Sequence, residues 1–264
     1  MKKDLTILIT NDDGYRAKGF QAMIELASHF GKVIGVAPKQ AQSGKSQALT
    51  ICDKVYVKKQ IDQDEITIYS LDGTPVDCIK FAMDHLLENQ KIDLVLSGIN
   101  HGSNAGVNVV YSGTMGAALE ASLYGIPSIG LSLLNIDDNA DFQTVVRYSK
   151  MLIEKILLTD NLEGVCFNIN FPDIKFEQIK GVRVSQQTKS MWKESFTPLS
   201  EQDGEICYMV QCTFQNMEPD QSKSDEWALN NGYVSIVPIQ MDKTSYKDLQ
   251  KVCSIFESET TINV

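Results

Sequence analysis

The first 40 residues alternate between apolar and amphipathic blocks. Residues 5–10 are apolar, largely β-branched and uncharged, which is typical of a strand buried on both faces. Residues 18–30 carry apolar side chains at helical spacing and are followed by Gly31, a plausible helix stop. Residues 32–38 form a second short apolar run. A strand, a helix and a strand in succession predict a βαβ unit and therefore a parallel sheet.

The same alternation continues to about residue 180. It predicts buried strands at Ile92–Leu96, Ile126–Leu133 and Val165–Phe171, and helices at 75–88, 114–124 and 141–158. Between residues 48 and 70, apolar and polar residues alternate singly, as they do in antiparallel ribbons. Strands that alternate with helices indicate an α/β fold with a parallel sheet.

The pattern changes after residue 180. Short alternating strands are expected at Val182–Gln186, Ile206–Phe214 and Tyr233–Ile239, whereas Met191–Asp203 reads as a mobile segment. We therefore expect a core of residues 1–180 and a smaller β-rich C-terminal extension, residues 181–264, that serves in subunit contacts.

Charge and cysteine usage narrow the functional class. The 264-residue chain has a formal net charge of −10, which argues against polymeric nucleic acid as its main partner. Its six cysteines form no CxxC pair, so reduced thiols and a cytoplasmic location are expected. No run of apolar residues is long enough to suggest a membrane span.

Oxygen-bearing side chains follow three of the predicted strands. Asp12 and Asp13 end the first, Ser43 follows the second and Asn100 follows the third. Adjacent carboxylates at the end of a buried strand repel each other, and a divalent cation offsets that cost. An Asx-rich turn is the alternative for the first cluster, and simple capping or solvation is the alternative for Ser43. Together the oxygens suit one Mg²⁺ or Mn²⁺.

A second candidate site lies in the glycine-rich stretch from residue 101 to residue 116. Ser112, Gly113 and Thr114 stand at the predicted start of a helix, where backbone amides, hydroxyls and the positive end of the helix dipole suit a phosphate. Ordinary N-capping by Ser112 or Thr114 is the alternative. Asn104 is a weaker candidate for the same phosphate.

Several long motifs together resemble one known family. They are Thr10–Gly14, Ser43-Gly44, Ser97–Asn104, Tyr111–Thr114 and Asp225–Ile236, which occur in this order over nearly the whole chain. The sequence resembles the survival protein E (SurE) nucleotidases. At Asn108 it departs from the many members that carry an acidic residue there.

The resemblance implies a three-layer Rossmann-like core and a C-terminal arm exchanged between subunits of a homodimer or homotetramer. It implies a metal-dependent phosphatase for nucleoside 5′- and 3′-monophosphates, with Asp12, Asp13, Ser43 and Asn100 as metal ligands. We expect Asp12 and Asp13 to be catalytic, with attack by a water that the metal holds or Asp12 orients. In the other form of this mechanism, an Asp carboxylate is the nucleophile. A non-catalytic metal- or nucleotide-binding module of the receiver type is the alternative function.

Overall fold

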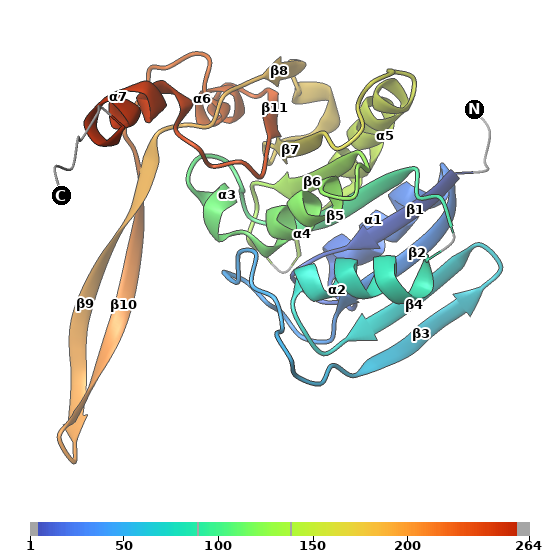
Figure 1. The fold of residues 1–264 in the computed structure, drawn as a ribbon, viewed down its shortest axis with the longest axis horizontal. Helices are drawn as coiled ribbons and strands as arrows, with labels where there is room; N and C mark the ends of the chain where they lie inside the picture. The colour runs from blue at the N-terminus through green and yellow to red at the C-terminus, as the bar shows by residue number, and fades with distance from the viewer. Residues whose placement is uncertain (1–4, 89, 138, 258–264) are drawn as a thin grey trace, which may run out of the picture.

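The computed structural model describes residues 5–88, 90–137 and 139–257, and within them nine strands form one sheet (Figure 1). Its order is β3-β4-β2-β1-β5-β6-β7-β11-β8. The six central strands are mutually parallel: β4 (Ile66–Leu71), β2 (Gly31–Pro38), β1 (Leu5–Thr10), β5 (Leu94–His101), β6 (Ser128–Leu133) and β7 (Cys166–Phe171). The parallel sheet expected from the alternating strands and helices is confirmed.

Helices cover both faces of the sheet. On one face, α1 (Lys18–Ser28) and α5 (Gln143–Leu157) bury their apolar sides against β1 and its neighbours. On the other, α2 (Pro75–Phe81) and α4 (Gly113–Ser122) pack over β1, β2 and β5. A single turn of π-helix, Ala82–Leu86, continues α2. The three layers confirm the predicted Rossmann-like α/β architecture.

The edge strands differ in direction from the central six. β3 (Val57–Gln63) runs antiparallel to β4 at one edge. At the other, β11 (Val234–Ile239) pairs antiparallel with β7, and β8 (Val182–Val184) pairs parallel with β11. Two strands from beyond residue 180 thus continue the core sheet. The division of the chain at residue 180 stays a prediction.

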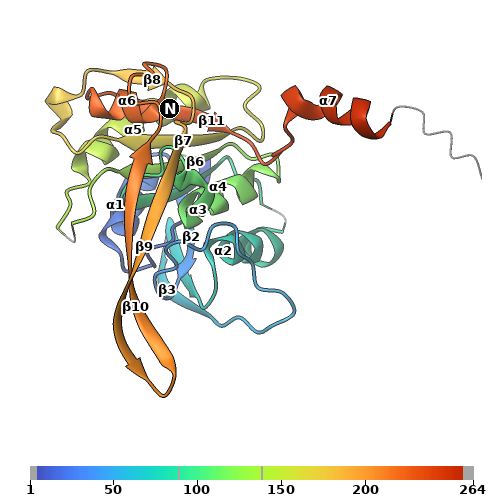
Figure 2. The ribbon, with the colours of Figure 1, turned by 90° about the vertical axis from the view of Figure 1, so that its left-hand side faces the viewer.

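A long hairpin projects from the body (Figures 1 and 2). It consists of β9 (Ser190–Gln202) and β10 (Glu205–Asn216), which pair antiparallel along their length. Residues 191–202 of the segment expected to be mobile belong to β9, a strand that the sequence pattern did not predict. Polar residues and Pro198 conceal the strand in the sequence, but its register places Trp192 opposite Phe214 and Phe196 opposite Val210. Cross-strand apolar pairs of this kind stabilise a ribbon.

The extension also contains helices that the strand pattern did not predict. α6 (Asp225–Asn230) follows the hairpin, and α7 (Tyr246–Phe256) ends the described chain. Figure 2 shows α7 standing clear of the main body, and none of its residues is buried. Short helices also occur at Asn108–Tyr111 (α3) and Phe176–Gln178 (η2). Within the described residues, no helix is both long and apolar enough to span a membrane.

Candidate metal and phosphate site

The turn that follows β1 is built by Asn11. Its side chain donates to the Gly14 carbonyl at 3.0 Å and accepts from the Gly14 amide at 3.2 Å, while Asn11 itself is fully buried. The Asx turn considered as an alternative is therefore present. It is made by Asn11, so Asp12 and Asp13 are not consumed by it.

Asp12 packs directly against the first residues of α4. Its Oδ1 accepts a hydrogen bond from the Thr114 hydroxyl at 2.5 Å, and a β-carbon on Gly113 would lie 2.9 Å from its Oδ2. Asp12 is only 4% exposed. Burial, and to a smaller extent the neighbouring Asp13, raises the pKa of this carboxyl to about 6, although the Thr114 hydroxyl opposes the shift. A carboxylate that is buried and ionised at this position favours a cation as its partner.

Asn100 reaches the same place from the neighbouring strand. β5 continues to His101, beyond the expected end at Leu96, and its pairing with β6 shifts register between Ser97 and Asn100. The Asn100 amide nitrogen donates to the carbonyls of His101 and Gly102 at 3.2 and 2.9 Å. Its Oδ1 lies 3.4 Å from the Thr114 hydroxyl oxygen. Thr114 therefore stands between the side-chain oxygens of Asp12 and Asn100.

Asp13 lies beside His101. One carboxylate oxygen is 3.4 Å from both the backbone nitrogen and the ring Nδ1 of His101, whose ring packs edge-on against Phe142. Asp13 and His101 also line an open cavity of about 310 Å³ together with Ala17, Lys18 and Ile136. This cavity gives solvent access to the Asp13 carboxylate.

Ser43 lies in an exposed loop after β2. The preceding residue, Gln42, donates its amide hydrogen to the Asp12 carbonyl at 2.7 Å, so the loop is attached to the turn that carries the carboxylates. The role of Ser43 as a metal ligand stays a prediction.

The N-terminus of α4, at residues 112–114, is capped by the side chain of Ser112. Ser112 accepts from the Met115 amide at 3.0 Å, which is the N-cap contact considered as an alternative. Thr114 is engaged with Asp12, and Gly113 permits the close approach between them. The backbone start of α4 thus adjoins the carboxylates, and its role in holding a phosphate stays a prediction.

Asn104 is part of a buried network of amides. Its backbone nitrogen donates to Asn170 and its carbonyl accepts from Asn168, each at 2.8 Å, while its side-chain nitrogen donates to Ser132 at 2.8 Å. Asn104 is 4% exposed. These contacts fix the glycine-rich loop (residues 102–107) onto β6 and β7. The sequence carries a faint signal of this, because Asn168 and Asn170 alternate with apolar residues in a buried strand.

The donor set can be tested against the needs of a cation. Within the described residues, no cluster of three or more His, Cys, Asp or Glu side chains is suited to a metal ion. The expected set instead has two carboxylates, one amide oxygen and one hydroxyl. Hard cations such as Mg²⁺ bind through one or two carboxylates and fill their remaining positions with water or substrate oxygens. The residues present fit such an ion and do not fit zinc.

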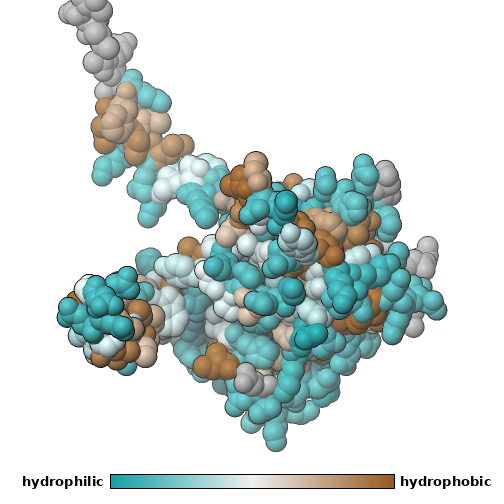
Figure 3. Space-filling model, turned by 90° about the horizontal axis from the view of Figure 1, so that it is seen from below, coloured by the Kyte–Doolittle hydropathy of each residue, from teal (hydrophilic) through white to brown (hydrophobic). Residues whose placement is uncertain are grey.

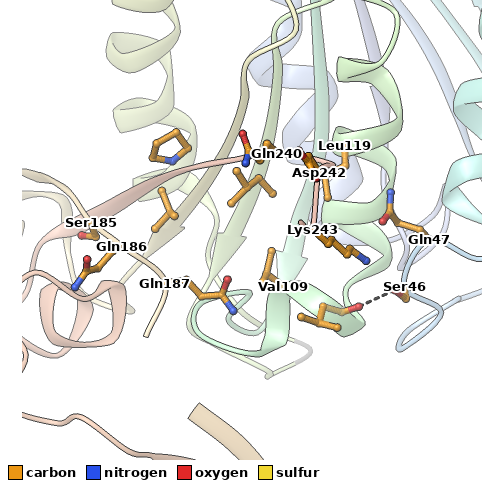
Figure 4. A pocket seen from close by; sticks show the side chains of 14 residues that line it. Ser46, Gln47, Val109, Leu119, Ser185, Gln186, Gln187, Gln240, Asp242 and Lys243 are labelled. Atoms are coloured by element: carbon orange, nitrogen blue, oxygen red, sulfur yellow. Dashed lines mark hydrogen bonds between the residues drawn. The ribbon is translucent and has the colours of Figure 1, made fainter. Parts of the chain in front are cut away.

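A separate cavity of about 570 Å³ lies beside α3, whose residues Val109 and Val110 line it (Figure 4). It is lined from the segment after β2, from α3 and α4, and from the chain that follows β11, including Gln47, Asp242 and Lys243. At its rim the Ser46 hydroxyl donates to the Val110 carbonyl at 2.6 Å, drawn as a dashed line in Figure 4. The predicted metal ligands do not line this cavity.

The family model described as survival protein SurE matches residues 7–194. The chain belongs to the SurE family. A curated SurE relative from Flavobacterium psychrophilum, named 5′-nucleotidase SurE, is 43% identical over 95% of this chain and 96% of its own.

More distant SurE members agree in sequence and in fold. The 5′-nucleotidase SurE of Aquifex aeolicus is 36% identical over 94% of this chain and 96% of its own length. The crystal structure of the SurE protein from Aquifex aeolicus superposes with a TM-score of 0.81 at 34% identity, covering 95% of this chain and 99% of that one. The likeness therefore includes the C-terminal extension as well as the Rossmann-like core.

Proposed function

We propose that this chain is a metal-dependent phosphomonoesterase that hydrolyses nucleoside 5′- and 3′-monophosphates to nucleoside and phosphate. The observation that carries the proposal is the convergence of Asp12, Asn100 and Thr114 at the carboxyl edge of the sheet, against the start of α4. Membership in the SurE family, whose matched relatives are named 5′-nucleotidases, supports this reaction.

Asp12, Asp13, Ser43 and Asn100 would hold one divalent cation, Mg²⁺ or Mn²⁺. When bound, the cation would polarise a phosphate oxygen and neutralise charge on the transferring phosphoryl group. Thr114 holds the Asp12 carboxylate in one orientation through its hydroxyl.

Residues at the start of α4 act on the substrate in this proposal. The amides of Gly113 and Thr114 point along the helix axis toward its N-terminus, where the helix dipole favours the phosphate oxygens. Asp12 orients a water for in-line attack, and an Asp carboxylate as nucleophile is the variant. Asn104 contributes by keeping the preceding loop on the sheet.

Exposed apolar residues on two projecting segments, α7 and the hairpin of β9 and β10, support a homo-oligomer. The apolar residues of α7 form a stripe, Tyr246, Leu249, Val252 and Phe256, that is between 46% and 77% exposed. The hairpin exposes Phe196 and Val210 on one face. Figure 3 shows hydrophobic side chains on both segments where they stand off the body. We propose that copies of this chain cover these surfaces in a dimer or tetramer.

The six cysteines are free thiols in the structure, which suits the cytoplasmic location that we propose. Neither this location nor the subunit number enters the catalytic scheme.

The decisive experiment is phosphate release from a panel of nucleoside 5′- and 3′-monophosphates with Mg²⁺, with Mn²⁺ and with a chelator. Ribose 5-phosphate serves as a substrate without a base. We expect metal-dependent release from the nucleotides and its loss in the chelator. Metal-independent release would contradict the metal role. Nucleotide binding without release would favour the non-catalytic receiver-type module.

A further inference from the structure

The glycine-rich loop is held on its outer side by the C-terminal extension. Asp225 Oδ2 accepts from the Gly106 amide at 2.9 Å, and the Ser190 hydroxyl accepts from the Val107 amide at 2.8 Å. The Trp192 indole nitrogen donates to the Asn108 side-chain oxygen at 2.8 Å. The last two residues of the loop and the first residue of α3 are therefore each fixed by a different side chain from α6 or from the base of the hairpin.

Asp225 is the centre of this attachment. It is fully buried, and its two oxygens serve two different segments. Oδ2 accepts from Gly106, while Oδ1 accepts from the Thr188 amide at 3.0 Å, the Thr188 hydroxyl at 2.5 Å and the Glu226 amide at 2.8 Å. A buried carboxylate is stable only with donors of this kind, and such bonds are stronger than those between neutral groups.

The contact leaves no room for adjustment at Gly106. This residue has a φ of +56°, and a β-carbon on it would lie 2.5 Å from the Ser190 hydroxyl oxygen. The loop runs from Asn104, which is bonded to the sheet, to Asn108, whose side-chain oxygen accepts from Trp192. The chain then passes through α3 to Ser112 and Thr114, whose hydroxyl contacts Asp12.

We propose that Asp225 is a positioning residue for the phosphate-binding start of α4, acting through Gly106 and the loop rather than by touching substrate. This role rests on the function proposed above. The predicted metal ligands Asp12, Asp13, Ser43 and Asn100 lie outside residues 106–108, which the C-terminal extension holds, so the loss of Asp225 should affect phosphate binding more than metal binding.

The substitution Asp225→Asn tests the role with little change in shape. Asparagine has one acceptor oxygen, so its NH2 group must face either the Gly106 amide or the amides of Thr188 and Glu226, and at least one contact is lost. We expect the dissociation constant for inorganic phosphate, measured calorimetrically with saturating Mg²⁺, to rise by about tenfold or more. The dissociation constant for Mg²⁺ alone should stay within about twofold, which is below the effect of one lost hydrogen bond.

The same variant should show a raised KM and a lowered kcat for 5′-AMP. Asp203→Asn, an exposed change in the hairpin turn, is the matched control and should leave all these constants unchanged. A loss of thermal stability alone, with phosphate affinity unchanged below the melting temperature, would make Asp225 merely structural and overturn the proposal.

A milder variant covers the case in which Asp225→Asn does not fold. Ser190→Ala with Trp192→Phe removes the two flanking contacts and keeps the aromatic ring. It should weaken phosphate binding by about threefold or more, in line with the loss of neutral hydrogen bonds, and unchanged affinity would overturn the proposal. If wild type binds Mg²⁺ and phosphate yet releases no phosphate from nucleotides, the proposed function fails while the positioning role is still measured.

Discussion

The Thr114 hydroxyl and the Asp12 carboxylate share a hydrogen bond whose two oxygens lie 2.5 Å apart. The bond joins the tip of β1 to the first turn of α4, so one contact sets the spacing between the predicted metal site and the predicted phosphate site. It also supplies a donor to a carboxylate whose pKa is raised mainly by burial.

Thr114→Val should therefore impair turnover strongly, although the substitution hardly changes the shape of the side chain. Valine keeps the shape of threonine but removes the donor, which leaves the Asp12 carboxylate buried with one partner fewer. We expect kcat/KM for nucleotides to fall by about 10- to 100-fold, as for a lost bond to a charged group. Thr114→Ser, which keeps the hydroxyl, should retain most of the activity. Equal losses in both variants would contradict the role of the hydroxyl.

Asp12→Asn should separate stability from function. The substitution removes an ionised group whose burial is costly above pH 6, so the melting temperature at pH 8 in a chelator should equal or exceed that of wild type. Added Mg²⁺ or Mn²⁺ should stabilise wild type but not the variant, because binding to the native state alone raises stability.

Turnover by Asp12→Asn should fall below about 1% of the wild-type rate, as expected for a group that stabilises transition-state charge. Thermal shift and phosphate release measured on the same samples give the comparison. Full activity together with metal-dependent stabilisation would remove Asp12 from the site.

The residues around the carboxylates and the start of α4 could be picked out from the sequence because they belong to local patterns. Asp12 and Asp13 directly follow an apolar strand, and Ser112 to Thr114 stand where a helix begins, so each could be found within a few residues of sequence. Parallel pairing then brings strand tips to one edge without further information. This is why Asp12 and Asn100 lie at the same edge, as expected from their positions in the chain.

The attachment of the glycine-rich loop to the C-terminal extension was not predictable by the same means. Asp225 is separated from Gly106 by 119 positions, and nothing in its own neighbourhood marks it as a partner of the glycine-rich loop. β9 was missed for a related reason, since its order depends on the register with β10 more than on its own alternation. Contacts that depend on long-range pairing leave little trace in local periodicity.

The raised pKa of Glu226 predicts that the stability of the folded protein depends on pH. Burial, followed by the neighbouring Asp225, raises the pKa of its carboxyl from 4.5 to about 7. The native state therefore binds this proton more tightly than the unfolded state, so the stability from this group is complete below pH 4.5 and is lost as the pH rises through about 7.

Glu226→Gln should remove that loss. At pH 8 the variant should be more stable than wild type by about 1 kcal/mol, a value that allows for solvent screening of a partly exposed group. Below about pH 4.5 the advantage should vanish, because the wild-type carboxyl is then protonated in both states. Denaturant unfolding at pH 4.5, 6 and 8 measures the difference, and an advantage that does not change with pH would exclude this explanation.

The exposed stripe on α7 predicts how the assembly can be broken. Leu249→Glu with Val252→Glu places two charges on the apolar face, and their desolvation in an interface is costly. We expect size-exclusion chromatography with light scattering to show a smaller species than wild type. Lys251→Gln with Ser254→Glu changes the net charge by the same amount on the opposite face of α7 and should leave the mass unchanged. A wild-type chain that is already monomeric, or an unchanged mass in the first variant, would contradict a role for α7 in assembly.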